Sequence, residues 1–464
     1  MFSPSTYQHR RASLCTLMHH TGLVFIPGND ESPMNYRDNV YRFRQDSTFL
    51  YFFGIDKPGY SGLIDCQSGV ATLFGHETTI DHVIWMGPQP SLADLADMAG
   101  GVETASPDTL ATRLTVSDQT LHLLPPYRDH HRLLLASLLR VSPEHLSRYV
   151  SEDLIRAIVA LRSLKTDEEL FQLEQACTRT SQMHLTGMRT AKPGMLESEV
   201  MAAVRAVPLS YGRDVSFPII CSVRGEVLHN HHHDNRLNSG QLLLLDAGGE
   251  SDFHYAGDMT RTFPVGPTFT AQQAEVYQIV LDSMKEAFSM IRPGAMYRDI
   301  HLAAARVITE GLQQLGLMKG DVSESVAAGA HGLFFPHGLG HMMGLDVHDM
   351  ENLGEDFVGY REGLQRSSQL GLKSLRLARE LQERFVLTVE PGIYFIPALI
   401  ETWKQKKHLA QFIQYEVLPD YYDFGGIRLE DDVVVTHDGY RILGTPAPKE
   451  LRDVESIRQQ AISG

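Results

Sequence analysis

The feature that most constrains this chain is a set of acidic side chains and one histidine at the ends of apolar or β-rich segments in its second half. The set comprises Asp246, Asp258, His341, Glu390 and Glu430. A carboxylate at the end of a buried strand needs a partner, because an unpaired charge is costly to remove from water. Divalent cations remove the repulsion between such carboxylates and turn them into ligands, so the set predicts a site for two metal ions.

Two of these residues lie on segments that are expected to pair. Leu242–Leu245 is a short apolar run followed by Asp246 and then Ala-Gly-Gly, a pattern typical of a buried strand that enters a turn. Asp258 follows after a glycine-rich stretch, so the two segments are predicted to fold back as antiparallel neighbours with facing carboxylates. Asp258, Thr260 and Thr262 would share one face of the second strand, which places Thr260 beside the metals.

A further strand is expected around Glu430. Arg428 and Glu430 share one face of it, where Arg428 could orient a ligand carboxylate through a charge-assisted hydrogen bond. Asp431 and Asp432 adjoin Glu430 and compete for its role. Strand alternation puts Asp431 on the opposite face and Asp432 one residue pair further along the strand.

The remaining members of the set are placed by glycines and a proline. His337 and His341 have the i, i+4 spacing of a helical zinc pair, but the glycines between them argue against a helix. Glu390 precedes Pro391, so Val386–Glu390 is predicted to be a strand that ends at its functional side chain. Oxygen-rich ligation with one imidazole favours manganese, with cobalt, zinc or iron as competitors.

Five segments that carry these residues resemble, in this order, the aminopeptidase P and prolidase family of pita-bread metallopeptidases. They are Leu-Leu-Leu-Leu-Asp246-Ala-Gly-Gly, Tyr255-Ala-Gly-Asp258-Met-Thr-Arg-Thr-Phe, His337-Gly-Leu-Gly-His341, Thr388-Val-Glu390-Pro-Gly-Ile-Tyr394 and Gly426-Ile-Arg-Leu-Glu430. Upstream, Tyr41–Gly54 and Trp85-Met-Gly87 are similar to the companion domain of these enzymes. The resemblance implies an α/β N-terminal domain over 1–164, then an α+β pita-bread catalytic domain over 165–464, with Glu430 as the ligand.

The activity that this resemblance implies is hydrolysis of the Xaa-Pro bond at the N-terminus of proline-containing dipeptides or peptides, with two divalent metal ions per chain. The stretch Gly371–Arg379 is similar to the prolidase segment whose arginine holds the dipeptide carboxylate, a role that falls to Arg376. This slightly favours dipeptides. The alternatives are an aminopeptidase P acting on longer peptides, a metal-free binding module of the same fold, and an Arg376 that only forms a surface ion pair.

Three further histidine roles follow from the resemblance. His229 corresponds to a substrate-contacting histidine, His348 to one that bonds the peptide carbonyl or the tetrahedral intermediate, and His337 to one that lines the pocket for the residue after the cut. Glu390 is the candidate for carrying a proton to the departing proline nitrogen. The run His229–His233 could also bind metal, although such runs are typical of solvated loops.

Composition is that of a globular enzyme with more than one domain. The chain has 464 residues, 43% hydrophobic and 21% charged, and its net charge of −16 disfavours nucleic acid or an anionic membrane as partner. The four cysteines are scattered, which predicts buried thiols and no disulfide framework. No segment approaches the roughly 18 apolar residues of a membrane helix. We expect a cytoplasmic protein, and the resemblance implies a homodimer.

Local patterns predict several elements that can be compared with the structure. Helices are expected over 6–19, 143–161, 171–190 and 196–207, and strands over 23–26, 49–54 and 62–64. Thr166 followed by Glu169 is a capping-box pattern that predicts a helix start just after the domain boundary. Two insertions of the larger prolidase type are expected at 351–383 and 398–424, the second of helical character.

Overall fold

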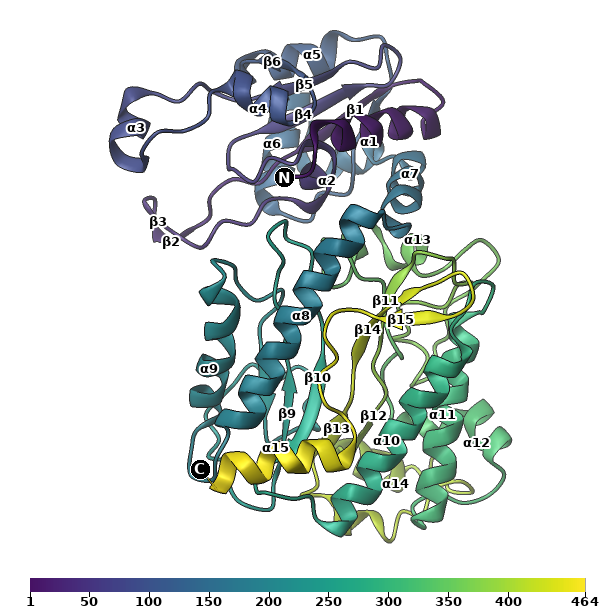
Figure 1. The fold of residues 1–464 in the computed structure, drawn as a ribbon. Coiled ribbons are helices and arrows are strands. Elements are labelled where there is room, and N and C mark those ends of the chain that lie inside the picture. Colours follow the sequence, from purple (N-terminus) through teal and green to yellow (C-terminus); the bar gives the residue numbers. More distant parts are fainter. Residues whose placement is uncertain (464) are drawn as a thin grey trace. The chain divides into compact units, whose positions relative to one another are not determined.

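The computed structural model describes residues 1–463 and divides into two compact units, seen as ribbons in Figure 1. Unit 1 comprises Met1–Arg162 and Asn352–Phe357. Unit 2 comprises Ser163–Glu351 and Val358–Gly464.

Unit 1 is an α/β domain around a five-stranded mixed sheet of order β6-β5-β4-β1-β7. β1 and β5 each run antiparallel to β4, while β7 and β6 add in parallel at the two edges. Its elements are α1 (Pro4–Leu17), β1 (Leu23–Pro27), β2 (Pro33–Tyr36), β3 (Asn39–Val40), α2 (Ser47–Phe53), β4 (Ser61–Asp65), β5 (Ala71–Phe74), α3 (Ile80–Met86), α4 (Leu92–Met98), β6 (Glu103–Ala105), η1 (Pro107–Thr109), α5 (Leu110–Val116), β7 (Leu121–His122), α6 (Asp129–Leu139), η2 (Pro143–Tyr149) and α7 (Glu152–Ser163).

One predicted strand of unit 1, over residues 49–54, is wrong, because residues 49–53 lie in helix α2 and Gly54 is its C-cap. A short apolar run flanked by turn residues suits a buried strand or a buried helix equally, and every residue of α2 is buried. The helix is fixed at its ends: the Asp46 carboxylate accepts a hydrogen bond from the Phe49 amide at 2.8 Å, and Gly54 ends the helix in the left-handed conformation. The predicted first helix and the strands at 23–26 and 62–64 are confirmed.

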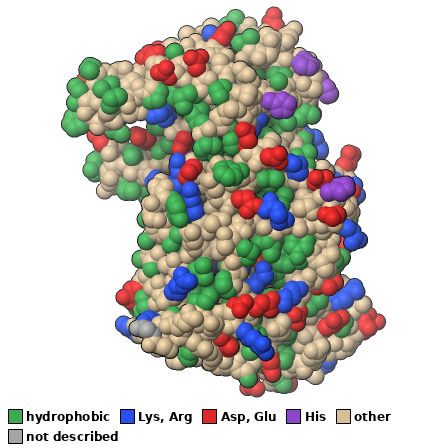
Figure 2. All heavy atoms as spheres, viewed as in Figure 1, with side chains coloured by type: hydrophobic (Ala, Val, Ile, Leu, Met, Phe, Trp, Pro, Cys, Tyr) green, Lys and Arg blue, Asp and Glu red, His purple; other side chains and the backbone are tan. Residues whose placement is uncertain are grey.

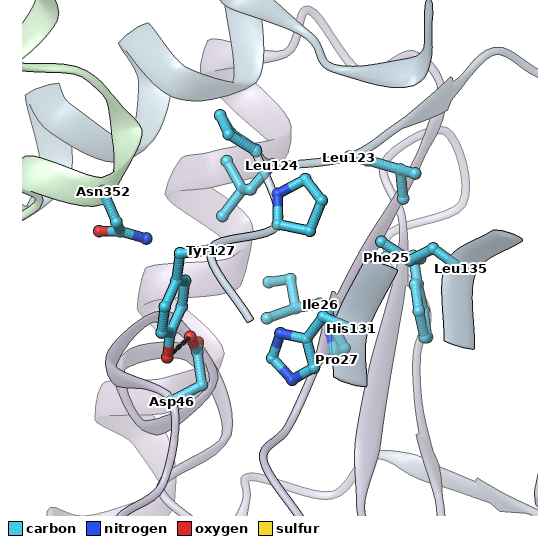
Figure 3. A pocket seen from close by; sticks show the side chains of 12 residues that line it. Phe25, Ile26, Pro27, Asp46, Leu123, Leu124, Tyr127, His131, Leu135 and Asn352 are labelled. Carbon is cyan, nitrogen blue, oxygen red and sulfur yellow. Dashed lines mark hydrogen bonds between the residues drawn. The ribbon is translucent and has the colours of Figure 1, made fainter. Parts of the chain in front are cut away.

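Unit 1 also carries a small pocket with apolar walls, shown in Figure 3. Phe25, Leu123 and Leu135 line it, and at its polar side Tyr127 donates a hydrogen bond to Asp46 at 3.1 Å. None of the metal-site residues predicted from the sequence lies in its wall.

Helix α3 of unit 1 exposes a group of apolar side chains. Ile80, Ile84, Trp85 and Met86 are all solvent-exposed, Trp85 by 84%. In Figure 2 hydrophobic side chains gather over the part of unit 1 that carries this helix. Among the described residues, the structure contains no helix with the length and apolarity needed to cross a membrane.

Unit 2 is built from three small sheets surrounded by long helices (Figure 1). The sheets have the orders β10-β9-β8, β11-β14-β15 and β12-β13. Its elements are α8 (Asp167–Thr190), α9 (Glu197–Ser210), β8 (Ile220–Ser222), β9 (Leu242–Asp246), β10 (Thr260–Pro264), α10 (Ala271–Met290), α11 (Tyr297–Gln314), α12 (Val322–Ala328), η3 (Ala330–Leu333), β11 (Val386–Val389), β12 (Gly392–Tyr394), α14 (Pro397–Gln405), η5 (Leu418–Tyr421), β13 (Gly426–Arg428), β14 (Asp431–Val435), β15 (Tyr440–Ile442) and α15 (Leu451–Ser463). Between η3 and β11 the chain also forms η4 (Glu351–Leu353) and α13 (Glu355–Val358), most of whose residues belong to unit 1.

The start of α8 confirms the capping box predicted from the sequence. The Thr166 hydroxyl accepts from the Glu169 amide at 3.3 Å, and the Glu169 carboxylate accepts from the Thr166 amide at 2.9 Å. Two of the otherwise unpaired amides at the helix start are thereby satisfied. The segment 398–424 carries helix, in α14 and η5, as predicted from its sequence.

The buried side chain of Arg458 connects helix α15 to two other segments of unit 2. Arg458 is fully buried, and its guanidinium donates to the backbone carbonyls of Pro264, the last residue of β10, and of Val265 at 2.8 and 2.6 Å. It also donates to the carbonyls of Met188 and Ala191 at the end of α8. Four carbonyls from two distant segments are thus satisfied by a single side chain.

Candidate metal centre

The strand pairing of unit 2 brings the predicted carboxylates together. β9 and β10 are antiparallel with Asp246 opposite Thr260, and Thr260 in turn forms a bridge with Glu430. Asp258 lies just before β10, so the predicted strand starts at Thr260 and not at Asp258. The Thr260 hydroxyl donates to Glu430 at 2.7 Å, which holds that carboxylate in place.

Three members of the predicted set form a compact buried cluster. Asp258, His341 and Glu430 each offer one ligand atom, and these atoms all lie within 4.8 Å of one another. His341 Nε2 lies 3.5 Å from an Asp258 oxygen and 3.6 Å from a Glu390 oxygen, so Glu390 adjoins the cluster through the imidazole. Asp246 is not part of this group of three and is bound instead by Arg428.

The His341 ring is oriented by the backbone around it. Its Nδ1 lies 3.1 Å from the Met342 carbonyl oxygen, which can only accept, so Nδ1 carries the hydrogen and Nε2 presents its lone pair to the cluster. The His341 amide donates to the Thr388 hydroxyl at 3.1 Å. A Cβ on Gly340 would lie 2.1 Å from the Thr388 carbonyl oxygen, which explains the glycine in this segment.

Asp246 is bound by a buried arginine, as predicted for Arg428. Arg428 Nη2 lies 2.5 Å from an Asp246 oxygen, Nε donates to Thr260 at 3.0 Å, and Nη1 donates to the Tyr394 hydroxyl at 2.8 Å. Tyr394 then lies 2.8 Å from His337 Nε2, and His337 Nδ1 donates to the Gly338 carbonyl at 2.8 Å. Both ring nitrogens of His337 are therefore engaged, and burial lowers its pKa to about 3, so the ring is neutral.

The cluster holds more negative charge than its protein partners neutralise. Burial, reinforced by the neighbouring carboxylates, raises the pKa of Asp258 and of Glu430 well above the usual range. Burial also raises the pKa of Glu390 to about 7. Asp246 and Asp258 each keep one buried oxygen without a hydrogen-bond partner in the described structure. Buried carboxylate oxygens without a partner, together with His341 Nε2 3.5 Å from the other Asp258 oxygen, are a donor set that suits a divalent cation, so these residues fit a metal site.

Asp431 and Asp432, which follow Glu430 at the start of β14, have partners outside the cluster or support its backbone. Asp431 is fully buried and lies 2.6 Å from Arg261 Nη2, with Lys449 as a second cation. Asp432 accepts from the Asp258 amide at 2.9 Å and from the Cys177 thiol at 3.1 Å. Asp432 thus supports the Asp258 backbone, a role that the sequence reasoning missed because Cys177 lies far away in the chain.

His348 lies beside the cluster and has a partner that the sequence did not predict. Its ring is 4.2 Å from the His341 ring, centroid to centroid, and its Nδ1 lies 2.5 Å from a Glu351 oxygen. The other Glu351 oxygen accepts from Arg376 Nε at 3.1 Å. Arg376 therefore lies within reach of the centre, through Glu351 and His348.

His229 lies in an exposed loop between β8 and β9. Partial burial lowers the pKa of the His229 ring, and the positive charge of Arg428 lowers it further, whereas the charge of Asp246 acts in the opposite direction. The ring is therefore close enough to interact with both Arg428 and Asp246. His233, from the same histidine run, lies 3.1 Å from the Ile219 carbonyl oxygen. The metal-capable cluster found among the described residues does not include any member of this run.

Comparisons with known proteins agree along nearly the whole chain. A model of metallopeptidase family M24 matches residues 172–437, and a model of the aminopeptidase P N-terminal domain matches residues 7–122. A human protein named "Xaa-Pro dipeptidase" is 35% identical over 445 residues, with 94% of this chain and 88% of the relative covered. A protein of Uncinocarpus reesii named "Probable Xaa-Pro aminopeptidase PEPP" is 32% identical over 456 residues, covering 95% and 91%.

Solved structures of similar fold include aminopeptidase PepP of Pseudomonas aeruginosa, with a TM-score of 0.82, 26% identity and 100% of both chains covered. A zinc-substituted Escherichia coli aminopeptidase P in complex with product gives a TM-score of 0.81 at 28% identity, with 99% of each chain covered. The predicted fold class, an α/β N-terminal domain followed by a pita-bread catalytic domain, is confirmed.

Proposed function

This chain belongs to metallopeptidase family M24, and from that premise we propose that it is an Xaa-Pro exopeptidase that uses two divalent metal ions. The observation that carries the proposal is the buried cluster of Asp258, His341 and Glu430, with Glu390 beside it. These residues and Asp246 would hold the ions, with manganese favoured by the many oxygen ligands. Divalent ions bound there would polarise the scissile carbonyl and lower the pKa of water.

The protein groups around the centre each have a task in this proposal. Glu390, which lies 3.6 Å from His341 Nε2 at the edge of the cluster, would carry a proton to the departing proline nitrogen. That nitrogen is a tertiary amide without a hydrogen, so it needs a proton in order to leave. His348 lies with Nδ1 2.5 Å from Glu351, and the ring would bond the peptide carbonyl or the tetrahedral intermediate, for which Nε2 has to carry a hydrogen.

Two further histidines would shape the substrate pocket. His337 has both nitrogens engaged, so its contribution is the ring face, which lies beside the rings of Phe335 and Tyr394 at centroid distances of 5.0 and 5.3 Å. Such an aromatic wall suits a proline ring. His229, on its exposed loop, would contact the substrate from the solvent side.

Substrate length is the finer part of the proposal. We assign a slight preference for dipeptides, because Arg376 lies within reach of the centre and a guanidinium can bind a free C-terminal carboxylate. Relatives with dipeptidase names and relatives with aminopeptidase names match this chain at similar identity, which supports both alternatives equally. The pairing of Arg376 with Glu351 favours the second candidate, an aminopeptidase P that acts on longer peptides.

The test is a comparison of Ala-Pro with Ala-Pro-Ala on the manganese-loaded protein and on Arg376→Ala. A charge-assisted bond of roughly 1.5–3 kcal/mol predicts about a 10- to 100-fold loss of kcat/KM for Ala-Pro in the variant, and little loss for Ala-Pro-Ala. Equal losses on both substrates would remove Arg376 from the dipeptide pocket. Absence of metal-dependent cleavage of either peptide would overturn the proposed function itself.

A further inference from the structure

A carboxylate in the first insertion, Glu351, contacts two residues of the candidate site at once. One oxygen lies 2.5 Å from His348 Nδ1 and the other accepts from Arg376 Nε at 3.1 Å. The side chains of Arg376 and Glu351 are 33% and 31% exposed, so a peptide can reach this pair from solvent. Glu351 was not among the residues predicted from the sequence.

Glu351 is an anion at neutral pH. Burial alone would raise its pKa, but the hydrogen bond from His348 and the charge of Arg376 lower it to about 2. Its carboxylate is the same chemical group as the C-terminus of a dipeptide. A dipeptide therefore meets an arginine whose charge is already matched by a carboxylate of the protein.

We propose that Glu351 sets the substrate-length preference, because its charge on Arg376 weakens the capture of a free C-terminal carboxylate and lets longer peptides compete. This inference rests on the proposed Xaa-Pro exopeptidase function. Glu351 acts through Arg376 and is a specificity-determining residue, not a catalytic one. A peptide that continues beyond proline, or ends in an amide, brings no charge to this position and does not feel the repulsion.

The size of the effect follows from Coulomb repulsion between two carboxylates that share one guanidinium. At a separation of a few ångströms in a partly exposed site, it amounts to about a 3- to 10-fold change in binding. Glu351→Gln keeps the shape and removes the charge. Because the substitution also alters the bond to His348, the absolute kcat can change, and the readout has to cancel that effect.

The matched substrates Ala-Pro and Ala-Pro amide provide such a readout. They differ only at the terminal carboxylate, so the ratio of their kcat/KM values reports carboxylate recognition and is insensitive to a change in the chemistry at His348. For Glu351→Gln the ratio of Ala-Pro to Ala-Pro amide is expected to rise about 3- to 10-fold. In an Arg376→Ala background, the same substitution should leave the ratio unchanged.

Glu362→Gln is the control, because it removes the same charge from an exposed position in the same insertion. The ratio should stay at the wild-type value in this variant, and thermal unfolding should verify that all variants are folded. A ratio that is unchanged or lower in Glu351→Gln would overturn the proposal and leave Glu351 as a positioning residue for His348. If the wild-type protein cleaves neither peptide, the proposed function fails first and this inference fails with it.

Discussion

Removal of metal should make the stability of this protein fall as the pH rises. In the metal-free protein, burial raises the pKa of Glu390 from 4.5 to about 7. The folded state then binds more protons than the unfolded state between these two values. Glu390 therefore contributes its full stabilisation of the folded state below pH 4.5. This contribution is lost as the pH rises through about 7.

The magnitude follows from the shift. At about 1.4 kcal/mol per pKa unit, a rise from 4.5 to about 7 corresponds to about 3 kcal/mol for this one carboxyl group. Asp258 and Glu430 shift in the same direction and share the protons of the cluster. For a domain of this size, about 3 kcal/mol lowers the melting temperature by roughly 5 to 10 °C.

The assay is calorimetry of chelator-treated protein between pH 5 and pH 8, repeated with excess Mn²⁺. With metal, the slope should shrink or reverse, because the ion replaces the protons and binds only the deprotonated ligands. Glu390→Gln should flatten the slope of the metal-free protein, whereas Glu152→Gln, at an exposed position, should not. A metal-free wild type whose stability is constant or increases over this range would refute the reasoning.

Three further substitutions test other parts of the site. His348→Ala should lower kcat about 100-fold or more with a small change in KM, measured by steady-state kinetics; an effect on KM alone would assign this ring to ground-state binding. Arg428→Met should destabilise the metal-free protein by about 3–5 kcal/mol in urea unfolding, because Asp246 is left buried and unpaired, and metal should restore part of the loss. Gly340→Ala should weaken Mn²⁺ binding in calorimetric titration, because its Cβ would collide with the Thr388 carbonyl; wild-type affinity would contradict the close approach.

The parts of this protein that could be predicted from the sequence are those fixed by local signals. The apolar run before Asp246, the glycines that follow it and the Thr166 capping box each determine a backbone course within a few residues, and the strand and helix start lie as predicted. The contact of Arg428 with a carboxylate of the predicted set was also predictable, although strand alternation, which puts Arg428 and Glu430 on one face, does not indicate that the partner is Asp246.

The parts that could not be predicted depend on distant partners. The segment 49–54 is apolar throughout, so only its burial on all sides and its end caps decide for a helix. The position of Glu351 depends on the path of the loop-rich segment that follows it and brings Arg376, 25 residues later, against its carboxylate. Asp432 supports the Asp258 backbone together with Cys177, which is 255 residues away, and no local pattern encodes that contact.

The buried guanidinium of Arg458 has a consequence for the order in which this protein can mature. Its carbonyl partners lie 193 to 270 residues earlier in the chain, on the segments that end α8 and β10. Contacts of such long separation form late, because the loops that they close carry a large entropic cost. On the ribosome, β9 and β10 emerge well before Glu430 and α15, so the centre cannot be assembled during most of synthesis. Metal loading is therefore a step that follows translation of these segments, and it takes place on an almost complete chain.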